Sequence, residues 1–422
     1  MPSKILISAY ACEPGKGSEP GVGWNIALQM AKDHEVWVLT RANNRSAIEL
    51  SLCQTSSRQL HFIYYDLPRW ARWWKRGSRG IQLYYYLWQV GIYFVARKLH
   101  TNIQFDLAHH VTFGKYWAPS LISLLPIPFV WGPVGGGESA PKAFWTSLGA
   151  RGVIVEVFRE LARLMFERDP FVRLTVRRSC MTLAKSPETS LRLVRLGAKR
   201  VKVFGESAIS SEELDWLAQK LRKEPELQSI KFISIGRFLP WKGFALGLQG
   251  FAIALQEAHE RELIHTEYWF VGSGPELPRL RSLSEKLGIA SCVKFWGRLS
   301  REDTLKKLVE CQVLVHPSLH DSGGWVCLEA MAAGKPVVCL DLGGPATQVT
   351  EKTGFKIFPG NPDQVVRDIG TAMAQVASDS NLRKQKEESA RNLIASEYLW
   401  DHKREFLSLL YKQVVQAKSK SF

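Results

Sequence analysis

The sequence has few cysteines, and none of them forms a Cys-x-x-Cys pair. Seven cysteines are scattered singly along the 422 residues. This odd set argues against both a disulfide framework and a thiolate zinc site, and it is typical of a reducing cytosol. The apolar run before Cys12 is too short for a signal peptide and predicts a buried first strand. We therefore expect a protein that is not exported.

A long uninterrupted hydrophobic run is also missing. The longest uncharged stretch, residues 116–137, has 22 residues but contains four prolines and several glycines. Proline breaks the helix that a membrane span of ~20 residues requires. The sequence therefore predicts no transmembrane helix.

Several common catalytic motifs are absent. No Gly-Lys pair is followed by Ser or Thr, which excludes a phosphate loop of the ATPase type. The glycines between residues 15 and 23 lack dinucleotide spacing, and the second strand ends in Thr40-Arg41 without an acid to bind a ribose, so an NAD dehydrogenase is disfavoured. His34-Glu35 lacks the second histidine of a zinc protease. No Asp-x-Asp pair exists to hold a metal in a nucleotide-sugar enzyme, so we expect no metal site.

Charge is unevenly distributed along the chain. The 56 basic residues exceed the 40 acidic ones by 16. Residues 1–210 hold 28 basic and 14 acidic side chains, whereas the remainder holds 28 and 26. The excess of positive charge therefore lies almost entirely in the first half of the chain.

The length and the hydrophobic pattern predict two α/β domains. A compact domain usually holds ~100 to 200 residues. Strand-length apolar runs alternate with helix-length segments in both halves, which indicates parallel sheets buried on both faces. We predict two doubly wound, Rossmann-like domains that face each other across a cleft. The predicted division is residues 1–208 for the acceptor-side domain, 209–228 for a linker and 229–396 for the nucleotide-sugar domain, with a helix at about 397–418 that packs back on the first domain.

One cationic turn follows the first strand of the second half. Gly236 and Arg237 stand at the end of that strand, and Lys242 and Gly243 precede a helix. Arginine offers a fork to phosphate oxygens, lysine offers a point charge, and helix N-termini favour anions. The turn therefore predicts a diphosphate site, in preference to a pair of solvated surface cations.

A second group of residues follows the predicted strand that ends at His316. Its loop carries Asp321 and the pair Gly323 and Gly324, whose backbone can approach phosphate closely. Glu329 lies in the second turn of the next helix, among apolar residues. Its carboxylate can accept hydrogen bonds from the two hydroxyls of a ribose.

With these residues the sequence resembles the group 1 retaining glycosyltransferases, family 4 of the sequence classification, which have the two-Rossmann glycosyltransferase B-type fold. The resemblance is carried by Arg237 with Lys242, the turn at residues 272–276, and the acid-x7-Glu motif of Asp321 and Glu329 followed by AMAAGKPVV. The stretches AYACEPGKGSEPGVGW and HHVTFGKYWAPSLISLLPIPFVWGPVGGGE look like one bacterial branch. The likeness covers nearly the whole chain.

The resemblance implies roles for residues of the second half. Arg237 and Lys242 would bind the donor diphosphate, next to Gly236, and Glu329 would bind the nucleotide ribose. Asp321, with the Gly323 and Gly324 backbone, would hold the donor sugar and phosphate. The first acid of the motif is usually Glu in the family, and the shorter Asp321 leaves the donor sugar open.

The resemblance also implies roles for residues of the first half. The loop from Gly15 through Gly17 to Glu19 would approach the donor phosphate and the acceptor, and Gly136 and Gly137 would lie on the acceptor side. The catalytic histidine of the family falls on His109. His110 is adjacent, and because strand neighbours point to opposite faces, only one of the two can face the cleft.

The expected mechanism follows from what is absent. Retention by double displacement needs a carboxylate nucleophile, and the sequence nominates none. We therefore expect front-face departure and attack, with the leaving diphosphate taking the acceptor proton and with Arg237 and Lys242 stabilising its charge. The expected donor is UDP- or GDP-linked, and no cofactor or metal is expected. The expected acceptor is lipid-linked or a saccharide.

The segment of residues 68–100 predicts contact with a membrane. It holds seven basic residues, no acid and nine aromatic residues. Cations attract anionic headgroups, and tryptophan and tyrosine settle at the boundary of a bilayer. We expect peripheral binding at the cytoplasmic face of the cell membrane. The alternative is that residues 81–99 form a core-packed helix and the tryptophans cover an acceptor pocket.

Two other classes of protein remain as alternatives to this enzyme. The sequence pI of about 9.5 would suit a nucleic-acid or anionic-surface binding protein without catalysis. However, the nearly neutral second half holds the specific motifs, so we expect no nucleic-acid partner. A phosphorylase or synthase of storage glucan is the other alternative, but the basic, aromatic first half favours a lipid-linked acceptor.

Overall fold

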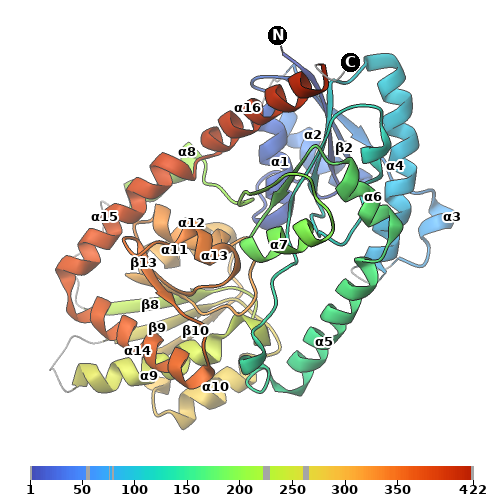
Figure 1. Ribbon diagram of the computed structural model, residues 1–422. Helices are drawn as coiled ribbons and strands as arrows, with labels where there is room; N and C mark the ends of the chain where they lie inside the picture. Colours follow the sequence, from blue (N-terminus) through green and yellow to red (C-terminus); the bar gives the residue numbers. More distant parts are fainter. Residues whose placement is uncertain are drawn as a thin grey trace. The chain divides into compact units, whose positions relative to one another are not determined.

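A computed structural model describes residues 2–53, 58–75, 77, 80–221, 229–259 and 266–419 of the chain (Figure 1). It contains two sheets, of seven and six strands in the described residues, and every strand pair in both sheets is parallel. The predicted class of two parallel-sheet α/β domains is confirmed. The chain divides into two compact units, which are described separately.

Unit 1 comprises Met1–Gly137, Glu160–Glu206 and Trp400–Phe422. Its sheet has the strand order β3-β2-β1-β4-β5-β6-β7. The strands are β1 Lys4–Ala9, β2 Glu35–Thr40, β3 Leu60–Tyr64, β4 Leu107–Thr112, β5 Phe129–Val134, β6 Met181–Ala184 and β7 Val201–Val203. Strands β1, β4 and β5 at the centre are almost fully buried, as expected for a parallel sheet covered on both faces.

The helices of unit 1 lie in the connections between these strands, except for α16, which follows the strands of both units in the chain. They are α1 Ser18–Met30, α2 Arg45–Leu52, α3 Arg69–Arg72, α4 Ile81–Ile103, α6 Pro170–Arg178, α7 Pro187–Arg195 and α16 Trp400–Ser419. Helix α16, red in Figure 1, packs against α1, blue. Arg404 of α16 forms an ion pair with Asp33, 2.8 Å between Nη1 and Oδ1, so the end of the chain is fixed to the first α/β repeat.

Unit 2 comprises Glu138–Arg159 and Ser207–Leu399. Its sheet has the order β10-β9-β8-β11-β12-β13. The strands are β8 Ile230–Ile235, β9 Thr266–Val271, β10 Val293–Gly297, β11 Val313–His316, β12 Val337–Leu340 and β13 Gly354–Ile357. The helices are α8 Ser211–Leu221, α9 Phe244–His259, α10 Leu277–Lys286, α11 Arg301–Val309, α12 Trp325–Ala332, α13 Gly343–Gln348, α14 Pro362–Ser378 and α15 Ser380–Glu397. Helix α5, Gly149–Phe166, contributes residues to both units.

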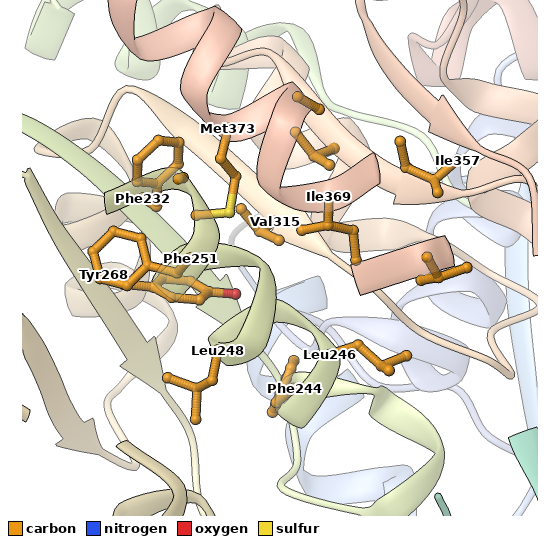
Figure 2. Packing of buried hydrophobic residues seen from close by; sticks show 14 of the residues in the cluster. Phe232, Phe244, Leu246, Leu248, Phe251, Tyr268, Val315, Ile357, Ile369 and Met373 are labelled. Carbon is orange, nitrogen blue, oxygen red and sulfur yellow. The ribbon is translucent and has the colours of Figure 1, made fainter. Parts of the chain in front are cut away.

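The core of unit 2 shows why the sequence forms these elements. Alternating residues of the strands, such as Phe232 and Tyr268, pack against the apolar face of α9, which presents Phe251 (Figure 2). Ile369 and Met373 of α14 close the same cluster. Burial of such side chains contributes about 1.5–3 kcal/mol each relative to exposure. The core therefore fixes strands β8, β9 and β11, whose ends carry the candidate site.

Residues 138–159 belong to unit 2. The boundaries predicted from the sequence assigned them to the first domain. Phe144 and Leu148 are buried in the same cluster as the strands of unit 2. The segment around these side chains shows no alternation of apolar and polar residues. The hydrophobic pattern therefore did not indicate whether they pack in the first or the second domain.

Helix α4 is the main element of the segment 68–100. One face packs into the core of unit 1 through Tyr84, Tyr85 and Trp88, which agrees with the core-packed alternative. The opposite face exposes a stripe of apolar side chains at helical spacing: Leu83, Leu87, Val90 and Phe94. Arg76 and Arg79 lie outside the described residues. Among the described residues, none of the helices has both the length and the apolar character needed to cross a bilayer.

Candidate active site

The candidate site lies where the parallel strands of unit 2 end. Strands β8, β9 and β11 are near neighbours in the sheet, so their carboxyl ends meet at one edge, where ligands of such folds bind. The loops after β8 and β9 approach very closely. A Cβ built on Gly272 would lie 1.8 Å from the carbonyl oxygen of Gly236, and Gly272 has a φ of 139°. Only glycine fits at Gly272.

A cavity of about 480 Å³ opens at these loops. Arg237 and Arg298 both line it, and both side chains are exposed. Neither guanidinium is paired with an acid in the described part of the chain. The residues around the cavity are Ile235, Gly236, Arg237, Val271, Gly272, Ser273, Arg298, Leu299 and Thr304. Two uncompensated cations with backbone N–H groups and hydroxyls suit a phosphate-bearing ligand.

Lys242 does not line this cavity. It ends the 3₁₀ turn η4, Pro240–Lys242, and its Nζ lies 2.6 Å from Oδ2 of Asp321. The two side chains are 19% and 18% exposed, so the ion pair is largely shielded from water. The structure thereby joins two residues that are 79 positions apart and that the sequence predicted separately.

Asp321 accepts three further hydrogen bonds. Nε2 of His316 lies 3.0 Å from Oδ2, and the backbone N–H groups of Gly323 and Gly324 donate to Oδ1 at 3.1 and 3.0 Å. Burial alone would raise the pKa of this carboxyl, but Lys242, His316 and the Gly324 N–H outweigh it and hold the pKa well below its usual range. Asp321 is therefore a fixed negative charge at the end of β11.

The loop between Asp321 and α12 is shaped by a second glycine. Gly324 is the N-cap of α12 and has a φ of 58°, in the left-handed region. A Cβ there would lie 2.3 Å from Oε1 of Gln348, whose Nε2 donates to the Gly323 carbonyl at 2.7 Å. This glycine turn directs the Gly323 and Gly324 N–H groups at Asp321.

Glu329 lies in α12 and is only 6% exposed. It forms an ion pair with Arg301 of α11, and Arg301 also binds Glu213 of α8 at 2.7 Å. Burial raises the pKa of Glu329 to about 7; Arg301 lowers it and Glu213 adds to the rise. Glu329 is thus a buried acid that changes protonation near neutral pH.

The structure therefore sorts the predicted residues of unit 2 into three groups. Lys242, Asp321 and the Gly323 and Gly324 backbone form one connected cluster. Arg237 lies in the cavity with Gly236. Glu329 forms the third group. Its ion-pair partner Arg301 lies on α11, and the same helix contributes Thr304 to the wall of the cavity.

The predicted residues of the first loop lie in unit 1. Gly17 is the N-cap of α1, and Gly15, with a φ of 65°, lies on the exposed turn before it. Oε1 of Glu19 accepts a hydrogen bond from the Gly114 N–H at 2.9 Å. This bond joins the first turn of α1 to the loop after β4. The donor and acceptor roles of these three residues stay predictions.

Gly136 and Gly137 lie after β5. The Gly137 N–H donates to Oγ1 of Thr189 at 3.0 Å, and its carbonyl accepts from Nε of Arg192 at 3.2 Å. Both partners belong to α7. The acceptor-side role of the pair stays a prediction, and the structure adds that Gly137 is held against the helix by two hydrogen bonds.

His109 lies in the middle of β4, which continues to Thr112. Its Nδ1 lies 2.6 Å from the Tyr411 hydroxyl and its Nε2 lies 2.6 Å from the Gly132 carbonyl oxygen. His110 is also buried. Burial lowers the pKa of His109 to about 4 and that of His110 to about 3. The catalytic role of His109 stays a prediction, and in the structure its ring joins β4 to α16.

Sequence reasoning missed four residues of the site: His316, Arg298, Arg301 and Glu213. The sequence held a weak signal for two of them. Arg298 follows β10 and Arg301 begins α11, so both lie in a turn between a strand and a helix, as Arg237 does. Glu213 gave no signal, since its contact with Arg301 spans 88 positions and depends on packing.

The comparison with protein families bears on this half of the chain. Residues 218–393 match the model of the glycosyl transferases group 1 family. The matched residues include Arg237, Lys242, Asp321 and Glu329. This part of the chain matches a group 1 glycosyltransferase domain, which confirms the resemblance to group 1; membership of family 4 and retention of configuration stay predictions.

Curated relatives match the chain over part of its length. An uncharacterized glycosyltransferase of Methanocaldococcus jannaschii, MJ1607, is 33% identical over 170 residues, which is 40% of this chain and 41% of that protein. The lipopolysaccharide core biosynthesis glycosyltransferase LpsE of Rhizobium meliloti is 28% identical over 187 residues, 44% of this chain and 49% of LpsE. The matches thus span less than half of these relatives.

The fold has solved counterparts over its full length. HepE of Anabaena, whose crystal structure holds UDP and glucose, matches with a TM-score of 0.58 and 18% identity over 100% of both chains. At this identity the likeness shows the fold alone. The predicted glycosyltransferase B-type fold is confirmed.

Proposed function

We propose that the chain is a retaining glycosyltransferase that moves a sugar from a UDP- or GDP-linked donor to a lipid-linked or saccharide acceptor, without a metal, at the cytoplasmic membrane face. The observation that carries the proposal is the Lys242–Asp321 pair, which stands at the strand ends of a group 1 glycosyltransferase domain. Cations held in place at these strand ends would stabilise the negative charge that grows on a departing diphosphate.

The donor diphosphate is assigned to the arginine cavity. Arg237 and Arg298 offer uncompensated guanidinium groups there, and Lys242 adds an ammonium that Asp321 holds in position at 2.6 Å. The two guanidinium forks supply positive charge of the kind that a divalent ion provides in other nucleotide-sugar enzymes. This supports turnover without a metal.

The ribose of the donor is assigned to Glu329. Arg301 binds Oε1 of the carboxylate, which fixes the side chain before a nucleotide arrives. An ionised carboxylate can accept one ribose hydroxyl at each of its two oxygens, whereas protonation turns one of these oxygens into a donor. Because the pKa of Glu329 is about 7, donor binding becomes sensitive to pH close to neutrality.

The proposed reaction is front-face substitution. The bond between the anomeric carbon and the diphosphate oxygen breaks, and the acceptor oxygen forms its bond to the same carbon on the same face. The acceptor proton passes to the departing diphosphate, whose growing charge Arg237 and Lys242 stabilise. Retention of configuration and the roles of Gly15, Gly17, Glu19, Gly136, Gly137 and His109 belong to this proposal.

The acceptor is assigned by analogy with relatives. LpsE is a lipopolysaccharide core glycosyltransferase, and the HepE structure holds UDP and glucose. These names support a glycan or lipid-linked acceptor and a UDP-sugar donor for this chain. They do not favour the alternative of a binding protein without catalysis.

Membrane docking is assigned to the segment 68–100. Trp70 and Trp73 are 79% and 77% exposed, and the apolar stripe of α4 lies in the same segment. Arg72 is partly neutralised, because its Nη1 lies 3.3 Å from Oδ2 of Asp66. We therefore expect the tryptophans to contribute as much to docking as the cations do.

A screen of nucleotide sugars tests the function. Thermal shift and donor hydrolysis are measured with UDP- and GDP-linked hexoses. The proposal expects at least one donor to stabilise the protein and to be hydrolysed slowly, with the Arg237→Gln variant losing hydrolysis but keeping most of the stabilisation by the donor. Arg367, exposed on α14 and outside the cavity, gives the matched control Arg367→Gln. A screen without any response to a nucleotide sugar or to its nucleotide contradicts the proposal.

A further inference from the structure

A second basic cavity lies entirely within unit 1. It has a volume of about 340 Å³ and is lined by the end of α5, the start of α6 and the end of α7. The lining residues are Leu164, Glu167, Arg168, Arg173, Arg192, Arg195 and Leu196. Four arginines and one glutamate leave the cavity with a strong positive charge. None of these residues belongs to the candidate active site.

One of the four arginines is structural. Arg192 donates to Glu167 at 3.3 Å, to Glu160 at 3.4 Å and to the Tyr116 hydroxyl at 3.2 Å. Two acids thus compensate its charge. Arg192 therefore forms part of the cavity wall, and Glu160 and Glu167 are engaged by its guanidinium group.

The other three arginines have no acidic partner among the described residues. Nη1 of Arg168 donates to the Leu164 carbonyl at 2.9 Å, and Nε of Arg173 donates to the Glu167 carbonyl at 3.1 Å. These bonds anchor both side chains to the last turn of α5 and leave other N–H groups of each fork for a ligand. The side chain of Arg195 makes no hydrogen bond in the described part of the chain. Guanidinium forks arranged in this way match the oxygens of a phosphate group.

Exposed apolar side chains lie on the same three helices. Leu161, Leu164 and Met165 of α5 are 56%, 48% and 63% exposed, and Leu191 and Val194 of α7 are 61% and 57% exposed. Large apolar side chains at such density around a charged cavity mark an interaction surface. A free phosphate would make no use of them, whereas acyl chains would.

We propose that this cavity binds the phosphate of a membrane lipid, with the acyl chains beside the exposed apolar residues of α5 and α7. The position supports a lipid over a soluble phosphate. The Tyr86 hydroxyl of α4 donates to Asp169, the N-cap of α6, at 3.1 Å, and the Tyr86 ring contacts Phe171. The start of α6 therefore contacts α4, which exposes the apolar stripe on the face away from the core of unit 1. The assignment does not depend on the proposed glycosyl transfer.

Vesicle sedimentation tests the lipid site. The vesicles contain phosphatidylcholine alone or phosphatidylcholine with phosphatidic acid, whose phosphomonoester presents free oxygens. The cavity variant Arg168→Gln/Arg173→Gln/Arg195→Gln is compared with the control Arg177→Gln/Arg178→Gln/Arg200→Gln, which removes the same charge from exposed positions outside the cavity. The proposal expects the cavity variant to bind phosphatidic acid vesicles roughly tenfold more weakly than the control, since a diffuse surface charge would affect both alike.

Two outcomes would overturn the proposal. Equal losses in the two variants overturn it, because the attraction is then diffuse. Inorganic phosphate that stabilises the wild type but not the cavity variant, together with unchanged vesicle binding, assigns the cavity to a soluble phosphate and also overturns it. If the triple variant does not fold, the single Arg195→Gln variant, which breaks no hydrogen bond, must still weaken vesicle binding. Donor hydrolysis by the cavity variant should match the wild type, so a failed nucleotide-sugar screen leaves this test intact.

Discussion

Lys242 and Asp321 form an ion pair of 2.6 Å between the turn after β8 and the loop after β11. Both residues were assigned to donor binding from the sequence, but their contact was not. The pair is largely buried, and the same carboxylate also accepts from His316 and two backbone N–H groups. The free protein thus holds its lysine in place before a substrate arrives.

Removal of the lysine should leave Asp321 without its main counter-charge. We expect Lys242→Gln to destabilise the protein by about 1–3 kcal/mol, the scale for a charged hydrogen bond broken in a partly buried site. The double variant Lys242→Gln/Asp321→Asn should recover most of this loss but no activity. Urea denaturation and donor turnover measure the two effects. Additive losses of stability in the double variant would contradict a direct pairing.

Glu329 should make the protein respond to pH near neutrality. Its pKa of about 7 lies above the ordinary value of 4.5, so the folded state favours the protonated acid. Stability from this group is therefore present below pH 4.5 and is lost as the pH rises from 4.5 to 7. Nucleotide affinity should change in the opposite direction, because the ribose needs the carboxylate.

The variant Glu329→Gln tests whether Glu329 causes both effects. It should remove both the fall in denaturation midpoint and the rise in nucleotide affinity between pH 5 and pH 8. Calorimetric titration with UDP and with GDP measures the affinity. A variant that keeps the wild-type pH profile would show that another group titrates.

Because His109 is buried, we expect the stability of unit 1 to fall in acid. Its pKa of about 4 lies below the ordinary value of 6.5, so the folded state favours the neutral ring. The stability that depends on this ring is present above pH 6.5 and is lost as the pH falls toward 4. On a shift of this size the loss is on the order of 3 kcal/mol. His109→Gln should flatten that part of the denaturation profile, and identical acid profiles of variant and wild type would contradict it.

Activity should survive an excess of chelator. Arg237, Arg298 and Lys242 supply the positive charge at the site, and the sequence has no Asp-x-Asp pair to hold a divalent ion. Donor hydrolysis with and without EDTA measures the effect. Loss of activity in EDTA, with recovery on addition of magnesium or manganese, would show that a metal takes part.

The two-sheet fold and the linear motifs could be predicted from the sequence, because both depend on local pattern. Buried apolar runs gave the strands, and the spacing of Asp321 and Glu329 on either side of a glycine turn gave the loop and the helix α12. Contacts set by tertiary packing could not be predicted. The pairing of Arg301 with Glu213 and Glu329 brings together three helices, and no spacing in the sequence encodes it.

Two further features, the burial of Phe144 and Leu148 in unit 2 and the basic cavity of unit 1, also depend on tertiary packing and could not be predicted from the sequence. Phe144 and Leu148 are apolar residues of the first half that are buried in unit 2, and a hydrophobic pattern does not say which core a residue joins. The second basic cavity, in unit 1, is formed by residues of three helices, although these residues lie in a region where basic side chains are frequent. A charge count indicated an excess there but not a site.

The most direct measurement of the central claim is the turnover of a nucleotide sugar by Arg237→Gln beside the control Arg367→Gln. Arg237 is assigned to the charge that develops on the departing diphosphate, so its loss should reduce kcat by about 10²–10³, the scale for one preorganised donor, with a smaller change in donor KM. The control should keep wild-type kcat. An Arg237→Gln variant with wild-type kcat would contradict the account.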